Sequence, residues 1–185
     1  WVAVAKKYGK NASVPLQFIK KLTGKGSLLY PLVEDLRTAV LANGAWTQDH
    51  IAEMAGLATA VSPLIAGGVT ARDIQVANLF YEFSTFCTSI VAQHANGTVL
   101  HARNQDYSPP GLSAITIDAE FRKGGKPLYV GTTFAGYVGL PTVHRFGGWS
   151  ASADSRFTDP LTGVAANLAS AKAGGRTVGM FLRDL

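Results

Sequence analysis

The sequence has few of the features that would make a disulfide, a membrane-spanning segment or a metal site. Its 185 residues include one cysteine, Cys87, which excludes a disulfide within the chain but neither an extracellular nor a lysosomal protein. No apolar run is long enough to span a membrane, and no secretory leader occurs; a mature chain starting at Trp1 would already have lost one. The four histidines show no metal-ligand spacing, so we expect no metal and no cofactor (His50, His94, His101 and His144).

Acidic residues are absent from residues 1–26, although the whole chain carries a net charge of +5. A basic, partly apolar segment of this kind indicates contact with an anionic lipid or membrane surface, and a solvated face is an equally good interpretation. Nucleic acid is not expected as a partner, because no nucleic-acid-binding motif is present. The lysines of this segment are Lys6, Lys7, Lys10, Lys20, Lys21 and Lys25.

The residues before Cys87 predict helices. A hydrophobic content of 47% is enough for the core of one domain. Apolar residues recur at helical spacing, and we interpret these stripes as core, with a lipid-facing surface as the alternative. The predicted helices cover Val14–Leu22, Ser27 to Asn43, Thr47 to the break at Pro63, and Thr70, which forms a capping box with Asp73, to Ser84.

The residues from Cys87 onward predict mainly strands. Short β-branched or alternating segments at 88–92, 98–103, 114–121 and 128–134 indicate four antiparallel strands in a meander. Two helices, at 164–173 and 178–185, are expected to follow. Helices followed by an antiparallel sheet define an α+β fold class.

The first two strands are expected to form a hairpin, because Asn96 and Gly97 are a strong turn signal. A two-residue loop would place Cys87 opposite Asp106. A three-residue loop would shift the register by one and place Arg103 on the face of Cys87. No regular register gives both, so a bulge would be needed to bring both side chains to the thiol.

These three side chains make chemical sense as a nucleophilic site. A thiol attacks as its thiolate, which the guanidinium of Arg103 would stabilise. If the chain were cut before Cys87, the new α-amine could act as the base and Asp106 could orient it. The alternatives are a buried inert cysteine, a surface pair of Arg103 and Asp106, or a dyad of Cys87 with His101.

Three blocks of sequence carry a family resemblance: FCTSIVAQ at 86–93, HARNQDY at 101–107 and GTTFAGYVGL at 131–140. Together they resemble the acid ceramidase and N-acylethanolamine acid amidase family, and FCTSIVAQ is closer to the amidase branch. These proteins are N-terminal-nucleophile hydrolases of the choloylglycine-hydrolase-like group.

The resemblance implies a self-cleaving lysosomal or secreted hydrolase of fatty acyl amides, either N-acylethanolamines or ceramide. Cleavage between Phe86 and Cys87 would give an α-subunit, 1–86, and a catalytic β-subunit, 87–185, which stay together. Cys87 would be the nucleophile, Arg103 the arginine beside it and Asp106 the aspartate that holds the amine. The implied fold is an αββα sandwich, here incomplete at its C-terminal end.

Further residues follow from the resemblance or from local patterns. Gly136 and Tyr137 would line the substrate pocket, and Asn11 and Asn96 each begin a glycosylation triplet. The chain departs from the family at Ser155, where a glutamate is usual before Arg156. The family's oxyanion asparagine would lie beyond Leu185. These departures keep a second hypothesis open, a catalytically inactive lipid- or partner-binding protein on the same scaffold.

Overall fold

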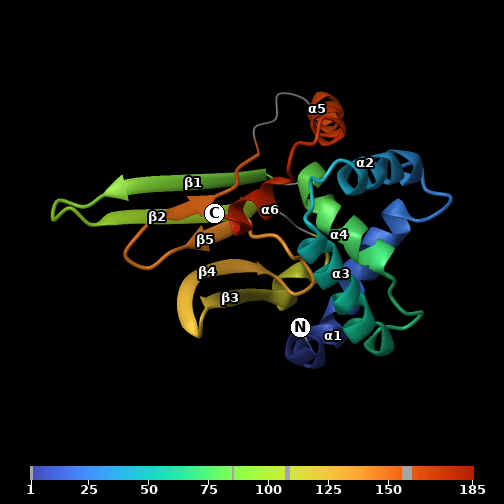
Figure 1. The fold of residues 1–185 in the computed structure, drawn as a ribbon, viewed down its shortest axis with the longest axis horizontal. Helices are drawn as coiled ribbons and strands as arrows, with labels where there is room; N and C mark the ends of the chain where they lie inside the picture. The colour runs from blue at the N-terminus through green and yellow to red at the C-terminus, as the bar shows by residue number, and fades with distance from the viewer. Residues whose placement is uncertain (1, 85, 107–108, 156–159) are drawn as a thin grey trace.

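The computed structural model describes residues 2–84, 86–106, 109–155 and 160–185, with helices before the strands and two further helices after them (Figure 1). Side chains are described for all of these except 2–6, 8–13, 81–84, 86, 160, 161 and 164. None of the described helices combines the length and apolar character needed to cross a bilayer. The helices are α1 (Val2–Thr23), α2 (Tyr30–Ala42), α3 (Gln48–Val61), α4 (Ala71–Ser84), α5 (Pro160–Lys172) and α6 (Val178–Arg183), with 3-10 turns η1 (Ser62–Leu64) and η2 (Leu112–Ile115). The strands are β1 (Phe86–Gln93), β2 (Val99–Asp106), β3 (Thr116–Lys123), β4 (Lys126–Phe134), β5 (Thr142–His144) and β6 (Ser150–Ser152).

Two helices start where the sequence predicts, each with reciprocal capping hydrogen bonds. Thr47 caps α3, since its hydroxyl accepts a hydrogen bond from the His50 N–H at 3.2 Å and His50 Nδ1 accepts one from the Thr47 N–H at 3.3 Å. At the start of α4, Thr70 and Asp73 exchange equivalent bonds of 2.9 and 3.2 Å. Such reciprocal bonds satisfy N–H groups that a helix start leaves unpaired. The predicted capping box of Thr70 and Asp73 is confirmed, as is the predicted start of a helix at Thr47.

Two other helix starts differ from the prediction. The N-cap of α2 is Leu29 rather than Ser27, because Pro31 occupies the first turn, where its missing N–H costs nothing. The Ser27 hydroxyl instead donates to the Leu22 carbonyl and accepts from the Leu29 N–H. Helix α1 begins at Val2 rather than Val14, since residues 2–7 are rich in alanine and lysine, which favour helix.

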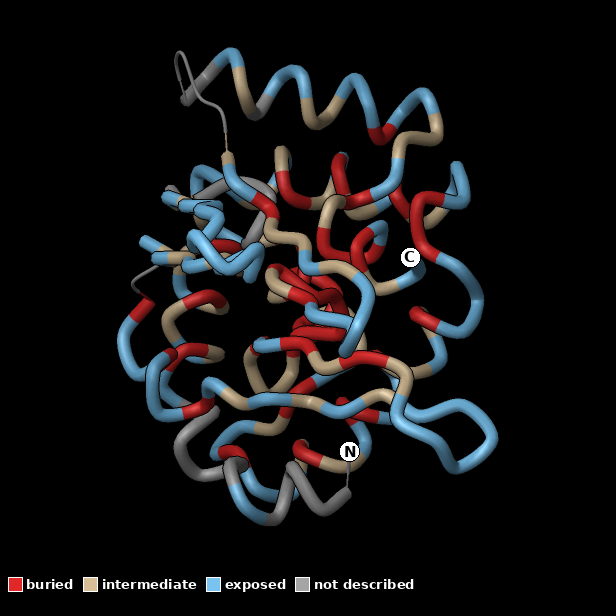
Figure 2. The backbone as a smooth tube through the Cα atoms, turned by 90° about the vertical axis from the view of Figure 1, so that its left-hand side faces the viewer, coloured by how far each residue is buried: buried red, intermediate tan, exposed pale blue. Residues whose placement is uncertain are grey.

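The main core lies among the helices. Its most deeply buried residues come from α2, α3 and α4, and Trp46 in the α2–α3 connection is 2% exposed. Figure 2 shows the buried positions gathered inside the fold and exposed backbone around them. The core also includes Val138, in the segment between β4 and β5, and Met180 of α6. Residues on both sides of Cys87 therefore share one hydrophobic core.

The predicted hairpin is present, with its register fixed by a three-residue loop. Gln93 pairs with Val99, and His94 N–H donates to the Thr98 carbonyl at 2.8 Å, which leaves Ala95, Asn96 and Gly97 in the loop. The ladder places Cys87 opposite Gln105 and Ser89 opposite Arg103. Cys87 and Arg103 therefore lie on one face of the hairpin.

The strands form two sheets, so the predicted single meander is wrong. Strands β1 and β2 make a two-stranded sheet, whereas β3, β4, β5 and β6 make a separate four-stranded antiparallel sheet in that order. The segment after β2 contains Pro109, Pro110 and the turn η2, which break the ladder between β2 and β3. The α+β class is confirmed in its coarser form, helices followed by antiparallel sheets.

One buried side chain ties the helices to the second sheet. Asn78 of α4 donates from Nδ2 to the Gly136 carbonyl at 3.0 Å, and its Oδ1 accepts from the Val138 N–H at 2.7 Å. Asn78 is 2% exposed. Its amide thus satisfies the buried Val138 N–H and the partly buried Gly136 carbonyl of the segment that follows β4.

Candidate active site

The candidate site lies where the base of the hairpin meets β5 and the segment after β6. Cys87 is the second residue of β1 and is partly exposed. The alternation of side chains along a strand sends Cys87 and Ser89 to the face that meets the second sheet. On β2 the same face carries the polar side chains His101, Arg103 and Gln105.

Arg103 is the centre of this site. Its Nη2 donates to Cys87 Sγ at 2.9 Å and to the Ala153 carbonyl at 2.6 Å, and its Nη1 donates to Thr142 Oγ1 at 2.6 Å. Asp154 lies 3.5 Å from Nε. The side chain is only 6% exposed, and a guanidinium stays protonated in proteins. A fixed cation is therefore held against the only thiol.

Gln105 lies directly across the ladder from Cys87 on the same face of the hairpin, and it was not among the predicted site residues. Its Oε1 accepts from Arg103 Nη1 at 2.8 Å. Its Nε2 is buried and has no hydrogen-bond partner among the described residues. The signal was present in the sequence, because a three-residue loop puts residues 101, 103 and 105 on the face of Cys87, but that register was one of two alternatives.

Asp106, the third predicted catalytic residue, lies on the other face of the hairpin. It pairs with Phe86 in the ladder and is exposed. Asn104 Nδ2 donates to its carboxylate at 2.5 Å. The structure thus brings Arg103 to Cys87 and leaves Asp106 beside the residue that precedes Cys87.

His101 belongs to a separate hydroxyl network. Its Nδ1 lies 2.8 Å from Ser150 Oγ and its Nε2 lies 3.2 Å from Ser152 Oγ. Ser152 in turn shares a hydrogen bond of 2.7 Å with Ser89. Both ring nitrogens of His101 are therefore engaged by serines of β6, which speaks against the alternative Cys87–His101 dyad.

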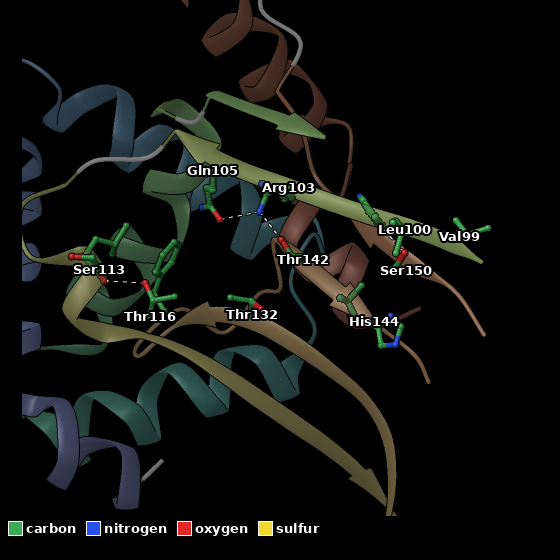
Figure 3. Close-up of a pocket in the computed structure, with 14 residues that line it drawn as sticks. Val99, Leu100, Arg103, Gln105, Ser113, Thr116, Thr132, Thr142, His144 and Ser150 are labelled. Atoms are coloured by element: carbon green, nitrogen blue, oxygen red, sulfur yellow. Dashed lines mark hydrogen bonds between the residues drawn. The ribbon is translucent and has the colours of Figure 1, made fainter. Parts of the chain in front are cut away.

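A groove of about 640 Å³ opens beside Arg103, between the hairpin and the second sheet (Figure 3). Arg103 and Gln105 line it from β2 and Thr142 lines it from β5. Its walls are mixed, with apolar side chains and hydroxyl groups side by side. The remaining lining residues are Val99, Leu100, His101, Leu112, Ser113, Thr116, Thr132, Phe134, Val143, His144 and Ser150.

Gly136 and Tyr137, predicted to bind substrate, line a different and smaller space. This pocket of about 50 Å³ lies between α1, α4 and the end of β4, with mainly apolar walls. Tyr137 is 7% exposed, and Gly136 has a φ of +108°, which favours glycine. Leu112 and Phe134 line both the pocket and the larger groove, so the two spaces are neighbours.

The other predicted positions fall on diverse elements. Asn96 is exposed at the hairpin tip, where its Oδ1 accepts from the Thr98 N–H at 3.0 Å. Asn11 lies in α1 and Phe86 begins β1, but both side chains are outside the described set, as is all of Arg156. Among the described residues, no three His, Cys, Asp or Glu side chains are grouped as a metal site would need.

Two kinds of curated protein share sequence with this chain, although no family model matches it. The N-acylethanolamine-hydrolyzing acid amidase of Oryctolagus cuniculus is 43% identical over 107 residues, or 57% of this chain and 28% of that protein. The acid ceramidase of Bos taurus is 35% identical over 120 residues, or 57% of this chain and 29% of that protein. The chain is homologous to both. The predicted resemblance to acid amidases and ceramidases is thereby confirmed, with the higher identity on the amidase side.

This acid amidase homologue spans less than a third of the length of the curated relatives it matches. A solved structure, that of the Caenorhabditis elegans N-acylethanolamine-hydrolyzing acid amidase ortholog, is 35% identical with a TM-score of 0.47. That match covers 54% of this chain and 42% of the other.

Proposed function

We propose that this chain carries the nucleophile of a self-cleaving hydrolase of fatty acyl amides. Cys87 becomes the N-terminal residue when the bond after Phe86 is cut, and it then attacks the amide carbonyl. The observation that carries the proposal is the 2.9 Å hydrogen bond from Arg103 to the Cys87 thiol at the edge of a large groove. Homology to an N-acylethanolamine-hydrolyzing amidase and to ceramidase supports the same reaction class.

The chemistry follows from the charges around the thiol. Arg103 stabilises the Cys87 thiolate, because opposite charges in contact favour the ionised form. The α-amine of Cys87 takes the proton of the thiol, and the thiolate adds to the acyl carbon. The ammonium group then returns that proton to the leaving amine as the carbon–nitrogen bond breaks, and a thioester remains. Water then hydrolyses the thioester, releasing the fatty acid and regenerating the thiol.

Asp106 takes its role only after cleavage in this proposal. In the uncut chain it lies opposite Phe86, the residue that cleavage separates from Cys87. The new amine is formed next to that position, so the carboxylate can turn from Asn104 toward it. An accepted hydrogen bond from the amine would fix the direction of the amine's lone pair.

Self-cleavage would use the same thiol on the carbonyl of Phe86. The resulting subunits, 1–86 and 87–185, would stay associated because Val138 and Met180 pack with the helices in one core. Asn78 adds two hydrogen bonds across this boundary. The two parts are therefore proposed as subunits of one folded unit rather than as independent domains.

Substrate and location follow from the same proposal. N-acylethanolamines or ceramide are the candidate substrates, with the acyl chain against apolar walls of the groove or of the smaller pocket at Gly136 and Tyr137. Leu28 is 99% exposed beside the basic segment, and exposed Lys25 lies three residues before it. An exposed leucine near lysines fits an anionic lipid surface. A lysosomal or secreted location, with a glycan on exposed Asn96, completes the proposal.

The decisive experiment is intact-mass analysis with N-terminal sequencing of the chain after incubation in mildly acidic buffer. We expect a new N-terminus at Cys87 in the wild type and a single uncut chain in Cys87→Ala. The buried Leu79→Ala variant controls for altered folding, because it removes packing rather than the thiol. Cleavage that persists in Cys87→Ala would overturn the proposed mechanism.

A second candidate is a catalytically inactive lipid-binding protein. It is favoured by one observation: Asp106 faces away from Cys87 and is engaged by Asn104. Under this hypothesis, the wild type and Cys87→Ala bind vesicles containing an anionic phospholipid equally well and neither hydrolyses an acyl amide. Turnover that disappears in Cys87→Ala would favour the hydrolase instead.

A further inference from the structure

Gln105 lies directly across the ladder from the nucleophile. Side chains that face each other in an antiparallel pair have Cβ atoms about 4.5–5.5 Å apart. The guanidinium of Arg103 bridges them, because it donates to Cys87 Sγ at 2.9 Å and to Gln105 Oε1 at 2.8 Å. The amide of Gln105 is thus fixed in the immediate surroundings of the thiol.

The contact with Arg103 determines which way this amide faces. A guanidinium has only donors, so the atom that meets it must be the oxygen of the Gln105 amide. The NH₂ group must then point away from Arg103, as Figure 3 shows. This nitrogen is buried and meets no acceptor among the described residues, and Gln105 is one of the residues that line the groove.

A buried donor without an acceptor is an uncommon feature of folded proteins and needs an explanation. Thr116 and Thr132 also line the groove and carry hydroxyl groups, but neither makes a described bond to the Gln105 nitrogen. An oriented donor beside a nucleophile is suited to a group on which negative charge develops during reaction.

We propose that Gln105 Nε2 donates a hydrogen bond to the carbonyl oxygen of the acyl amide as Cys87 attacks it. This inference rests on the proposed hydrolase function. The sulfur–carbon bond forms, the π electrons of the carbonyl move onto its oxygen, and Gln105 stabilises that oxyanion. When the carbonyl re-forms, the carbon–nitrogen bond breaks and the leaving nitrogen takes the proton delivered by the Cys87 α-amine. Gln105 is then a catalytic residue supplied by the same hairpin as the nucleophile.

The neutral substitution Gln105→Met tests this role in the full chain. It keeps an unbranched side chain of similar length and removes the donor. The substrate probe is N-palmitoyl-7-amino-4-methylcoumarin, whose hydrolysis passes through an oxyanion. Iodoacetamide alkylation of Cys87 is the second readout, because displacement of iodide forms no oxyanion. Gln93→Met is the matched control, since Gln93 is exposed at the far end of β1.

We expect Gln105→Met to lower kcat by about 10²–10³, the loss typical of removing one oxyanion donor, with KM little changed. Its rate of alkylation by iodoacetamide should equal that of the wild type. In Gln105→Glu, which keeps an oxygen toward Arg103 but replaces the donor nitrogen, kcat should also fall. Gln93→Met should match the wild type in both assays.

Three results would overturn the inference. Hydrolysis of the probe by Gln105→Met at the wild-type rate would show that the reaction does not need this donor. Equal losses of hydrolysis and alkylation in Gln105→Met would mean that Gln105 only positions Arg103 and the thiol. If the wild-type protein is alkylated but neither hydrolyses the probe nor forms a thioester, the proposed function is refuted and the inference with it. The first two results concern the Gln105→Met variant and leave the proposed function standing.

Discussion

The helical core and the hairpin are stabilised in different ways. In the helices, Leu79 and Met54 are completely buried, and α3 and α4 begin with reciprocal caps. On the hairpin, Val91 and Leu100 are more than half exposed. The described side-chain hydrogen bonds from the hairpin to the second sheet and the segment after β6 come from Arg103, His101 and Ser89.

This difference separates stability from chemistry. Burial of apolar side chains stabilises the helices, whereas the hairpin relies on a few hydrogen bonds that also define the candidate site. Substitutions in the helices should therefore lower the free energy of unfolding. Substitutions at the base of the hairpin should mainly change the reactivity of Cys87. The same residue type occurs in both regions, which allows matched variants.

The largest difference between the helices and the hairpin should come from replacing a leucine in each region. Leu79→Ala removes a completely buried side chain of α4 and should lower the free energy of unfolding by about 2–5 kcal/mol. Leu100→Ala changes a side chain that is 57% exposed on β2 and should stay within about 0.5 kcal/mol of wild type. Urea denaturation followed by circular dichroism measures both. Equal losses in the two variants would show that the hairpin is as tightly packed as the helices.

Replacing an asparagine in each region should give the next largest difference in the free energy of unfolding. Asn78→Ala leaves the buried Val138 N–H and the Gly136 carbonyl without their side-chain partner, which should cost about 1–3 kcal/mol. Asn104→Ala removes only an exposed contact with Asp106 and should have little effect. The same denaturation experiment applies, and a neutral Asn78→Ala would mean that the helices and the second sheet are held together without this amide.

Replacing a histidine in each region should give the smallest difference, which shows only in how the free energy of unfolding depends on pH. Burial, followed by the charges of Arg183 and Arg176, lowers the pKa of His50 from its ordinary value. The unfolded chain then binds a proton at a pH where folded His50 stays neutral. The free energy of unfolding therefore keeps its full value above about pH 6.5, the ordinary pKa of histidine, and decreases as the pH falls below it.

The measurement is the free energy of unfolding between mildly acidic and neutral pH. In His50→Gln the free energy of unfolding should decrease less toward acidic pH than in the wild type. In His94→Gln, a change beside the exposed hairpin loop, it should decrease as in the wild type. An identical slope in His50→Gln would assign the pH dependence to other groups. Of these groups, Asp184 is the first to test, because its carboxylate lies 3.3 Å from His50 Nε2.

Local chemistry was predictable from the sequence where one side chain decides the outcome. Thr47 and Thr70 start their helices as predicted, because each cap needs only residues three apart. Ser27 failed as a cap because Pro31, four residues later, fits the first turn better. The strands β5 and β6 were missed, since three residues each are too few to show an alternating pattern.

The register of the hairpin explains why the candidate site was only partly predictable. A two-residue turn would need positive φ at both Asn96 and Gly97, but only Gly97 has one, of +87°. The Asn96 side chain instead accepts from the Thr98 N–H, which suits the longer loop. This choice brings Arg103 to the thiol, turns Asp106 away, and adds Gln105. A difference of one residue in the length of the loop thus decides which side chains share the face of Cys87.

The shared core has a consequence for the molecule once it has been cut. Val138 and Met180 pack among helices that would belong to the other polypeptide after scission. Before scission, refolding is unimolecular; afterwards, two separate polypeptides must meet. The thermal midpoint of the cut form should then rise with protein concentration, while that of the uncut form should not. Maturation would therefore make the folded state sensitive to dilution.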